Sequence, residues 1–320
     1  MRNNLRDWLL RSGEAKRMAL IAHASPDGDT VGATLALRLA FLSMGKEVDV
    51  VLDGTVPRSM RFLAGADAFI SPEEAMGPYD AAIAVDVADK RLMGEAQKVF
   101  DGAAVRLVID HHPTNALFGD INFVRGGECS CCVLAYEAIE AMGAEMTAEI
   151  GTCLMLGMST DTGHFQYAYT SARAFEVAAK LVALGVDVSY ITRVLYRMQP
   201  KNMVALTRIA YQKMRFELDG RVGVIELTAQ DFETAGCTPF DTAGLVNLAL
   251  EVEGVRMAVL ATERGEETKL SLRAVEPDTV NDVAARFGGG GHAQAAGCSM
   301  KASVSDAVNQ ILAVMAEKLG

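Results

Sequence analysis

Short apolar runs alternate with amphipathic stretches over the first 185 residues. Strands covered on both faces are predicted at MALIAHA, EVDVVLD, DAAIAVD and VRLVID, which begin at positions 18, 47, 80 and 105. Helices are expected over 29–44, 130–142, 147–158 and 171–184, and glycines at 45 and 185 end two of them. This alternation predicts an α/β fold, in which right-handed crossovers build a mostly parallel sheet.

The pattern changes after about residue 187. Residues 187–215 look helical and mixed in charge, with Pro200 interrupting them. Strands then follow at RVGVIEL, VRMAVLAT and ETKLSLRAV, and helices are expected over 241–251, 278–286 and 303–318. We therefore predict three parts, which are an N-terminal parallel-sheet domain (1–186), a helical connector (187–215) and a smaller α/β domain (216–320). A cleft is expected between the two domains.

Composition narrows the class of protein. Half of the 320 residues are apolar, enough for a core in each domain. The net charge of −11 argues against binding of long DNA or RNA, which depends on many Lys and Arg contacts. A small phosphorylated ligand stays compatible, because metal ions and a few arginines can supply local positive charge.

Localisation signals are also informative. No apolar run approaches the roughly 18 residues that span a bilayer. We interpret the N-terminus as an amphipathic helix and a core strand, not as a signal peptide. The cluster CSCC at 129–132 lacks a second cysteine pair at zinc-finger spacing, so reduced, partly buried thiols near a helix start are expected. This fits a cytoplasmic enzyme without membrane attachment.

The candidate chemistry follows the predicted strands of the first domain. The segment HASPDGD follows the first strand, Asp86 ends the third, and the triplet Asp110, His111 and His112 ends the fourth. Ligands of parallel sheets bind beyond the carboxyl ends of the strands. These distant segments should therefore converge on one rim, where imidazole and carboxylate groups would suit a hydrolytic metal centre.

Each motif also has a structural explanation. A helix cap would account for Asp27 or Asp29, although not for both together with His23. Asp86 alone would be a cap or turn residue, whereas in combination it could bridge two metal ions. Asp161, in STDTGHF, would otherwise be a turn residue. An Asp-His-His triplet at a strand end is hard to explain by packing.

The second domain contains the run GGGGHAQAAG at 288–297. A glycine run is often a flexible linker, but core-like segments flank this one. Glycines also let backbone N–H groups approach a phosphate closely. Arg273 precedes the run on a predicted strand, where it is either a solvated surface residue or an anion clamp.

Taken together, HASPDGD, AVDVAD, IDHHPTN, STDTG, SLRAV and GGGGHAQAAG resemble the motifs of the DHH–DHHA1 phosphoesterase superfamily, in its order and across residues 18 to 300. The compact layout is similar to the nanoRNase branch of bifunctional oligoribonucleases and 3′-phosphoadenosine 5′-phosphate phosphatases. RecJ-type exonucleases are longer, family II pyrophosphatases lack the GGGGH run, and membrane-bound cyclic-dinucleotide phosphodiesterases have transmembrane segments. The stretch RGGECSCC departs from the usual Ser- and Thr-rich run, although Ser130 would keep part of its role.

The resemblance implies two divalent ions, usually manganese, with magnesium or cobalt as alternatives. His23, Asp27 and Asp86 would bind the first ion, and the second would be bound by Asp29, Asp86, His111 and Asp161. Asp110 would orient a ligand histidine, and His112 would contact the scissile phosphate. The other phosphate or the terminal end of the nucleotide would be bound by Arg273, Gly288, Gly289, Gly290, Gly291 and His292.

The resemblance implies an enzyme, a two-metal hydrolase that degrades short oligonucleotides from the 3′ end and dephosphorylates 3′-phosphoadenosine 5′-phosphate. A phosphodiesterase for cyclic or linear dinucleotides could use the same residues. A nucleotide-binding regulator without turnover is the alternative from a different class. Expected partners are short oligonucleotides and phosphorylated nucleotides rather than long duplexes or membranes. Related proteins are often homodimers.

Overall fold

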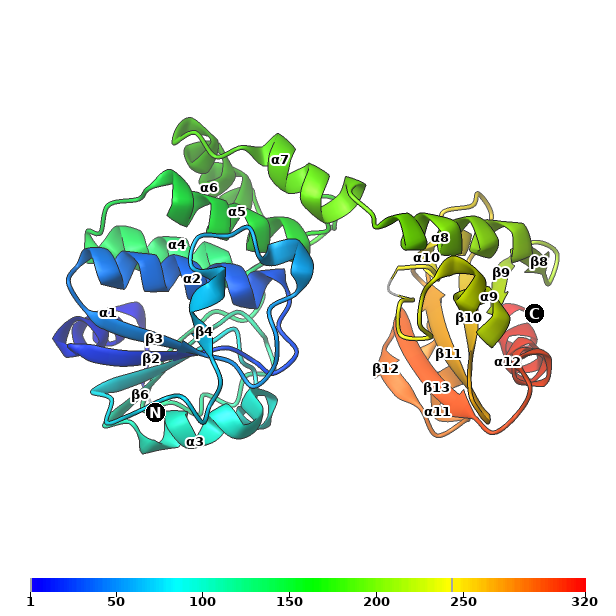
Figure 1. The fold of residues 1–320 in the computed structure, drawn as a ribbon, viewed down its shortest axis with the longest axis horizontal. Coiled ribbons are helices and arrows are strands. Elements are labelled where there is room, and N and C mark those ends of the chain that lie inside the picture. Colours follow the sequence, from blue (N-terminus) through cyan, green and yellow to red (C-terminus); the bar gives the residue numbers. More distant parts are fainter. Residues whose placement is uncertain (1, 243) are drawn as a thin grey trace. The chain divides into compact units, whose positions relative to one another are not determined.

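The computed structural model describes residues 2–242 and 244–320, and the chain folds into two compact units (Figure 1). The first unit extends to Met198 and the second begins at Gln199. The segment expected to form a connector contributes to both units. Its first part is α7 (Val188–Thr192) and a π-helical segment (Arg193–Arg197), and its second part is α8 (Lys201–Lys213), for which Pro200 is the N-cap.

An entirely parallel, seven-stranded sheet forms the centre of the first unit, in the order β1-β7-β6-β5-β2-β3-β4. Its strands are β1 (Arg2–Asn3), β2 (Arg17–Ile21), β3 (Glu47–Val51), β4 (Phe69–Ile70), β5 (Ala81–Val85), β6 (Val105–Asp110) and β7 (Ile121–Val124). The four predicted strands are confirmed as β2, β3, β5 and β6. The others were not predicted, because strands this short carry too little hydrophobic pattern.

Helices cover both faces of this sheet (Figure 1). On one face pack α1 (Leu5–Glu14), α2 (Gly28–Ser43) and α4 (Cys131–Met142). An outer layer of α5 (Ala148–Asp161) and α6 (Ala172–Ala183) packs on these helices. The other face is covered by α3 (Gln97–Gly102) and the 3-10 segment before it (Lys90–Ala96). The segment between β3 and β4 contains two further 3-10 turns, Arg58–Met60 and Ala66–Ala68. Burial on both faces explains why every residue of β5 is buried.

The second unit is a six-stranded mixed sheet, in the order β12-β13-β11-β10-β9-β8, in which only β9 and β10 pair in parallel among the described strands. Its strands are β8 (Arg215–Glu217), β9 (Val222–Leu227), β10 (Met257–Arg264), β11 (Glu267–Ala274), β12 (Gly290–His292) and β13 (Ala295–Met300). The helices α11 (Asn281–Ala285) and α12 (Val304–Leu319) pack on one face, and α8, α9 (Ala229–Ala235) and α10 (Asn247–Leu250) on the other.

Two predictions for the second unit need correction. The helix expected over 241–251 is only α10, and position 243 lies outside the described residues. The helix α9 was not predicted, although Thr228 and Asp231 form a capping box at its start. Among the described residues, no helix combines the length and the apolarity needed to cross a membrane.

Glycines bring α2 and α5 into close contact. A Cβ atom on Gly32 would lie 2.4 Å from the carbonyl oxygen of Cys153, and one on Gly28 would lie 2.4 Å from Oγ1 of Thr160. The start of α2 therefore lies beside the end of α5. This antiparallel contact joins the helix end that carries Asp29 to the helix end that carries Asp161.

We predict that Gly32→Ala lowers the free energy of unfolding by about 1–3 kcal/mol, because the new methyl group meets backbone that cannot rotate away. Urea unfolding followed by circular dichroism measures this. Gly13→Ala in α1 is the matched control, since its Cβ atom meets nothing within 4 Å and alanine favours a helix. Equal effects of the two substitutions would contradict the role of the α2–α5 contact.

Candidate metal centre

The carboxyl ends of β2, β5 and β6 meet at one edge of the parallel sheet and carry the predicted ligands. Ligand atoms within 4.8 Å of one another form three overlapping groups, which are His23, Asp27 and Asp86, then Asp29, His111 and Asp161, and finally Asp86, His111 and His112. All six residues predicted as metal ligands thus lie together. The third group also includes His112, which was predicted only to contact phosphate. Its position next to His111 in the sequence could have indicated that it is a further candidate ligand.

Asp29 is fully buried and is held by the start of α4. Its carboxylate accepts hydrogen bonds from Oγ of Ser130 at 2.6 Å, from N of Cys131 at 2.5 Å and from N of Cys132 at 3.0 Å. Backbone N–H groups and the helix dipole stabilise a negative charge at this position. The segment that departs from the Ser- and Thr-rich pattern therefore still binds a carboxylate, through Ser130 and two backbone N–H groups.

The cysteines of this segment pack in the core of the first unit. Cys129, Cys131 and Cys132 are buried free thiols at the start of α4, as predicted. Burial raises the pKa of Cys131 and Cys132 well above the ordinary value, and the nearby carboxylates raise it further. Both shifts favour the protonated form of these thiols.

Asp86 has an unusual backbone and a carboxylate oxygen without a partner. Its φ is 59°, in the left-handed region that residues other than glycine rarely adopt. Only 2 % of the side chain is exposed, and Oδ2 accepts a hydrogen bond from Oγ1 of Thr30 at 2.7 Å. Among the described residues Oδ1 accepts no hydrogen bond, and it lies 3.5 Å from Nε2 of His111. A buried carboxylate oxygen of this kind fits a bound cation.

Asp27 has two uses. Its Oδ1 caps α2 by accepting hydrogen bonds from the backbone N–H groups of Asp29 and Thr30, each at 3.0 Å. The capping interpretation is therefore right for Asp27. The same carboxylate lies in the group with His23 and Asp86, so capping does not exclude metal binding.

The tautomer of His111 follows from its backbone contact. Nδ1 lies 2.8 Å from the carbonyl oxygen of Glu128, which can only accept, so Nδ1 carries the hydrogen. In the neutral ring, Nε2 then presents its lone pair. It lies 3.2 Å from Oδ2 of Asp161 and 3.7 Å from Oδ2 of Asp29. This is the arrangement of a metal-binding histidine with a backbone partner.

Asp110 is buried and bonds to His112. Its Oδ1 lies 2.7 Å from Nδ1 of His112, and its Oδ2 accepts a hydrogen bond from Nδ2 of Asn115 at 2.6 Å. The resemblance implied that Asp110 orients a ligand histidine, but its partner was not among the expected ligands. The hydrogen bond with Asp110 raises the pKa of His112. The His112 side chain is 43 % exposed, so solvent reaches it.

The cluster carries more negative charge than its histidines offset. Burial raises the pKa of Asp86 well above its usual range, and the charges of Asp29 and Asp27 raise it further. For the same reasons the pKa of Asp161 is raised to about 11. Imidazole and carboxylate ligands without thiolate suit manganese, magnesium or cobalt better than structural zinc. The residues present thus fit divalent cations.

The predicted substrate-binding residues of the second unit are neighbours in its sheet. Arg273 on β11 pairs with Ala295 on β13, which pairs with His292 on β12. Arg273 is half-buried, and its Nη1 donates to the carbonyl oxygen of Leu272 at 3.0 Å. The structure describes the backbone of His292, and the role expected of its side chain lies outside this description.

The run GGGGHAQAAG is not a flexible linker, because it forms the hairpin of β12 and β13. Cβ atoms on Gly289 and Gly291 would lie 2.2 Å and 2.4 Å from carbonyl oxygens of β13, so packing requires both glycines. Gly288 has a φ of 72°, which glycine adopts without strain. A Cβ atom on Gly290 would meet nothing within 4 Å. Packing therefore explains Gly289 and Gly291 and backbone conformation explains Gly288, whereas the space beside Gly290 is open.

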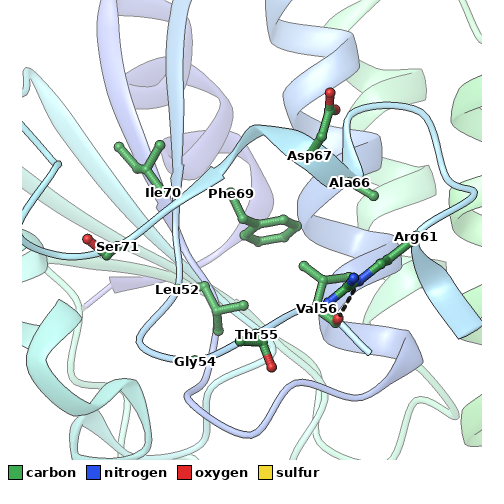
Figure 2. Close-up of a pocket in the computed structure, with 10 residues that line it drawn as sticks. All are labelled: Leu52, Gly54, Thr55, Val56, Arg61, Ala66, Asp67, Phe69, Ile70 and Ser71. Carbon is green, nitrogen blue, oxygen red and sulfur yellow. Dashed lines mark hydrogen bonds between the residues drawn. The ribbon is translucent and has the colours of Figure 1, made fainter. Parts of the chain in front are cut away.

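A cavity of about 370 Å³ lies beyond the ends of β3 and β4, at the same edge as the metal centre (Figure 2). Phe69, Leu52 and Val56 gather around its centre, and Nε of Arg61 donates to the carbonyl oxygen of Val56 at 3.4 Å. A Cβ atom on its lining residue Gly54 would lie 2.6 Å from the carbonyl oxygen of Ala24, next to His23. None of the candidate ligands is among the described residues that line it, so the cavity is separate from the ligand cluster.

Comparison with known proteins agrees with this geometry. Residues 17–158 match the family model "DHH family, N-terminal domain", and residues 222–320 match the DHHA1 domain. The chain is 32 % identical over 302 residues to the bifunctional oligoribonuclease and PAP phosphatase NrnA of Thermus thermophilus, covering 94 % of this chain and 89 % of that protein. The protein of the same name from Bacillus subtilis is 24 % identical over 87 % of each chain.

A solved structure also resembles the chain. It is the crystal structure of an exopolyphosphatase-related protein from Bacteroides fragilis, with a TM-score of 0.88 and 25 % sequence identity. The similarity covers 98 % of this chain and 94 % of that one.

With a chelator present, the free energy of unfolding should fall as the pH rises from 5 to 8. The pKa values of Asp86 and Asp161 are raised in the folded chain, so folding takes up protons that the unfolded carboxylates, with pKa near 3.8, have released. Each proton contributes a slope of up to about 1.4 kcal/mol per pH unit. Urea unfolding at several pH values measures it.

Asp86→Asn should make this slope shallower, because one titrating group is removed. Saturating Mn²⁺ should reverse the trend, since the cation favours the ionised carboxylates. A stability that rises with pH in chelator would contradict the charge balance described for this cluster.

Proposed function

Because this chain belongs to the DHH family and carries a DHHA1 domain, we propose that it is a two-metal phosphoesterase acting on short oligonucleotides from the 3′ end and on 3′-phosphoadenosine 5′-phosphate. The observation that supports this most strongly is the buried cluster of carboxylates and imidazoles at the edge of the first sheet. The names of the relatives support the choice of substrates.

The proposal assigns two cation sites. His23, Asp27 and Asp86 would bind one ion, and Asp29, Asp86, His111 and Asp161 would bind the other. Manganese suits this ligand set, as do magnesium and cobalt. Bound divalent ions would lower the pKa of water and neutralise charge on the phosphoryl oxygens.

Within this proposal, His112 acts on the substrate. Asp110 holds Nδ1 of His112 and favours the protonated ring, whose Nε2 can then donate to a phosphoryl oxygen or to the leaving oxygen. Asn115 holds the other oxygen of Asp110, so the imidazole has a fixed orientation. Asp110 is thus a positioning residue for His112.

The DHHA1 unit would bind the rest of the substrate. Arg273, the glycines at 288–291 and His292 would contact a further phosphate or the terminal end of the nucleotide, and the open backbone of Gly290 suits such an approach. The net charge of −11 favours short substrates over long nucleic acids. We also propose that the protein is a homodimer located in the cytoplasm.

The proposal predicts manganese-dependent hydrolysis of two substrates, a five-nucleotide RNA and 3′-phosphoadenosine 5′-phosphate, lost on addition of chelator. Product analysis by ion-exchange chromatography measures it, with a cyclic dinucleotide and pyrophosphate in parallel. Preference for the cyclic dinucleotide would replace the proposal by a dinucleotide phosphodiesterase. Nucleotide binding without hydrolysis of any substrate would indicate a regulator.

Two classes of variant should separate the roles of the two units. Asp86→Asn and Asp161→Asn should lower kcat at least about 100-fold, because they remove ligands of the proposed ions. Arg273→Gln should mainly raise KM, since its proposed contact is with a non-reacting part of the substrate. Steady-state kinetics with the five-nucleotide RNA distinguish the two. Near-normal turnover in either aspartate variant would refute the metal assignment.

A further inference from the structure

The segment that follows Asp161 makes a strained turn. Gly163, His164 and Phe165 have φ values of 55°, 62° and 64°, and two of these residues are not glycine. Hydrogen bonds hold the turn, because N of His164 donates to the carbonyl oxygen of Ser159 at 2.6 Å and N of Phe165 donates to Oγ1 of Thr162 at 2.9 Å. The structure thus maintains a costly conformation directly beside a candidate metal ligand.

This turn presents two exposed tyrosines. Tyr167 is 50 % exposed and Tyr169 is 58 % exposed. Both lie within eight residues of Asp161, whose side chain is only 20 % exposed. Their ring centroids are 5.6 Å apart and the rings are tilted by 40°, so they form one aromatic surface. Exposed aromatic groups beside a site of phosphate chemistry suit a ligand with a flat apolar face.

Both tyrosines contact the backbone of the turn that begins at Asp161. Oη of Tyr169 donates a hydrogen bond to the carbonyl oxygen of Asp161 at 2.7 Å. The ring of Tyr167 lies against Gly163, where a Cβ atom would come within 2.4 Å of it. Because both contacts are to the turn or to the candidate ligand itself, the rings have a defined position before any substrate binds.

We propose that Tyr167 and Tyr169 form a stacking platform for the nucleobase next to the scissile phosphate, an inference that rests on the proposed function. A base lies one ribose away from its phosphate, so a phosphate near Asp161 would bring the base close to Tyr169, which bonds to that residue, and to the neighbouring ring of Tyr167. Every base has a π-face, so the platform would bind bases without strong sequence preference. Stacking on neutral rings needs no additional lysine or arginine. It therefore suits the binding of an anionic nucleotide by a chain whose net charge is −11.

Dinucleotides with single abasic positions test this platform. The substrates are an intact dinucleotide and two analogues that lack either the 5′ or the 3′ base, compared by steady-state kinetics with Mn²⁺. The variants are Tyr169→Ala, Tyr169→Phe and Tyr167→Leu. Tyr211→Ala is the control, because that tyrosine on α8 is 52 % exposed. Thermal unfolding of each variant checks that the fold is kept.

Stacking predicts that Tyr169→Ala raises KM for the intact dinucleotide roughly 5- to 150-fold and leaves kcat within about twofold. Tyr169→Phe should keep the wild-type KM, because the ring remains and only the hydrogen bond to Asp161 is lost. Tyr167→Leu should raise KM, and Tyr211→Ala should not. One abasic analogue should raise the wild-type KM by a similar factor and have no further effect in Tyr169→Ala.

Three outcomes would overturn the platform. If Tyr169→Phe behaves like Tyr169→Ala, the hydroxyl only positions Asp161. If Tyr169→Ala raises KM by the same factor for the intact dinucleotide and for both abasic analogues, the ring does not contact a base. If the tyrosine variants keep the wild-type KM and a further variant in the cavity of Figure 2, Phe69→Leu, raises it, the base lies in that cavity instead.

Failure of the proposed function can be distinguished from failure of the platform. If the proposed function is wrong, the wild-type protein hydrolyses no dinucleotide. Calorimetric binding of the same three dinucleotides would then test the platform separately. Loss of binding in Tyr169→Ala that Tyr169→Phe restores would support the platform. Equal binding by the wild type and Tyr169→Ala would refute it.

Discussion

Repulsion between buried carboxylates is the constraint on which the rest of this structure depends. Asp29 and Asp86 lie almost completely out of water, a few ångströms from His111 and Asp161. Such a group of like charges opposes folding unless hydrogen bonds, protons or cations offset it. Bound divalent cations, as the proposed function requires, would offset these charges and would need the carboxylates close together.

The scaffold supplies part of this compensation locally. Backbone N–H groups at the start of α4 and Ser130 stabilise Asp29, and Thr30 stabilises one oxygen of Asp86. The glycines of α2 allow α5 to approach, so that Asp161 reaches the same place. The parallel sheet provides the remaining positions, because the carboxyl ends of its strands meet at one edge. Secondary structure, helix packing and hydrogen bonds thus all act to position the carboxylates of this one cluster.

Much of this could be predicted from residue patterns, and the exceptions have physical reasons. The strands β2, β5 and β6 were predictable because each is a continuous apolar run, and the candidate ligands follow those runs directly. The helix α9 was not predicted because its seven residues carry little periodicity. The hairpin of β12 and β13 was not predicted because its glycines hide the strand pattern. Which of the two adjacent histidines bonds to Asp110 could not be predicted, because that depends on their surroundings.

The amino-acid sequence by itself determined the order of elements, the residue types at the centre and the family to which the chain is similar, because these depend on short-range patterns. Tertiary structure alone decided which atoms meet. Glu128 orients His111 across 17 positions, Ser130 bonds to Asp29 across 101, and the turn after Asp161 exposes two tyrosines beside a candidate ligand. Hydrogen bonds of this kind require atoms within about 3 Å of one another, and only the packed backbone brings such distant residues that close.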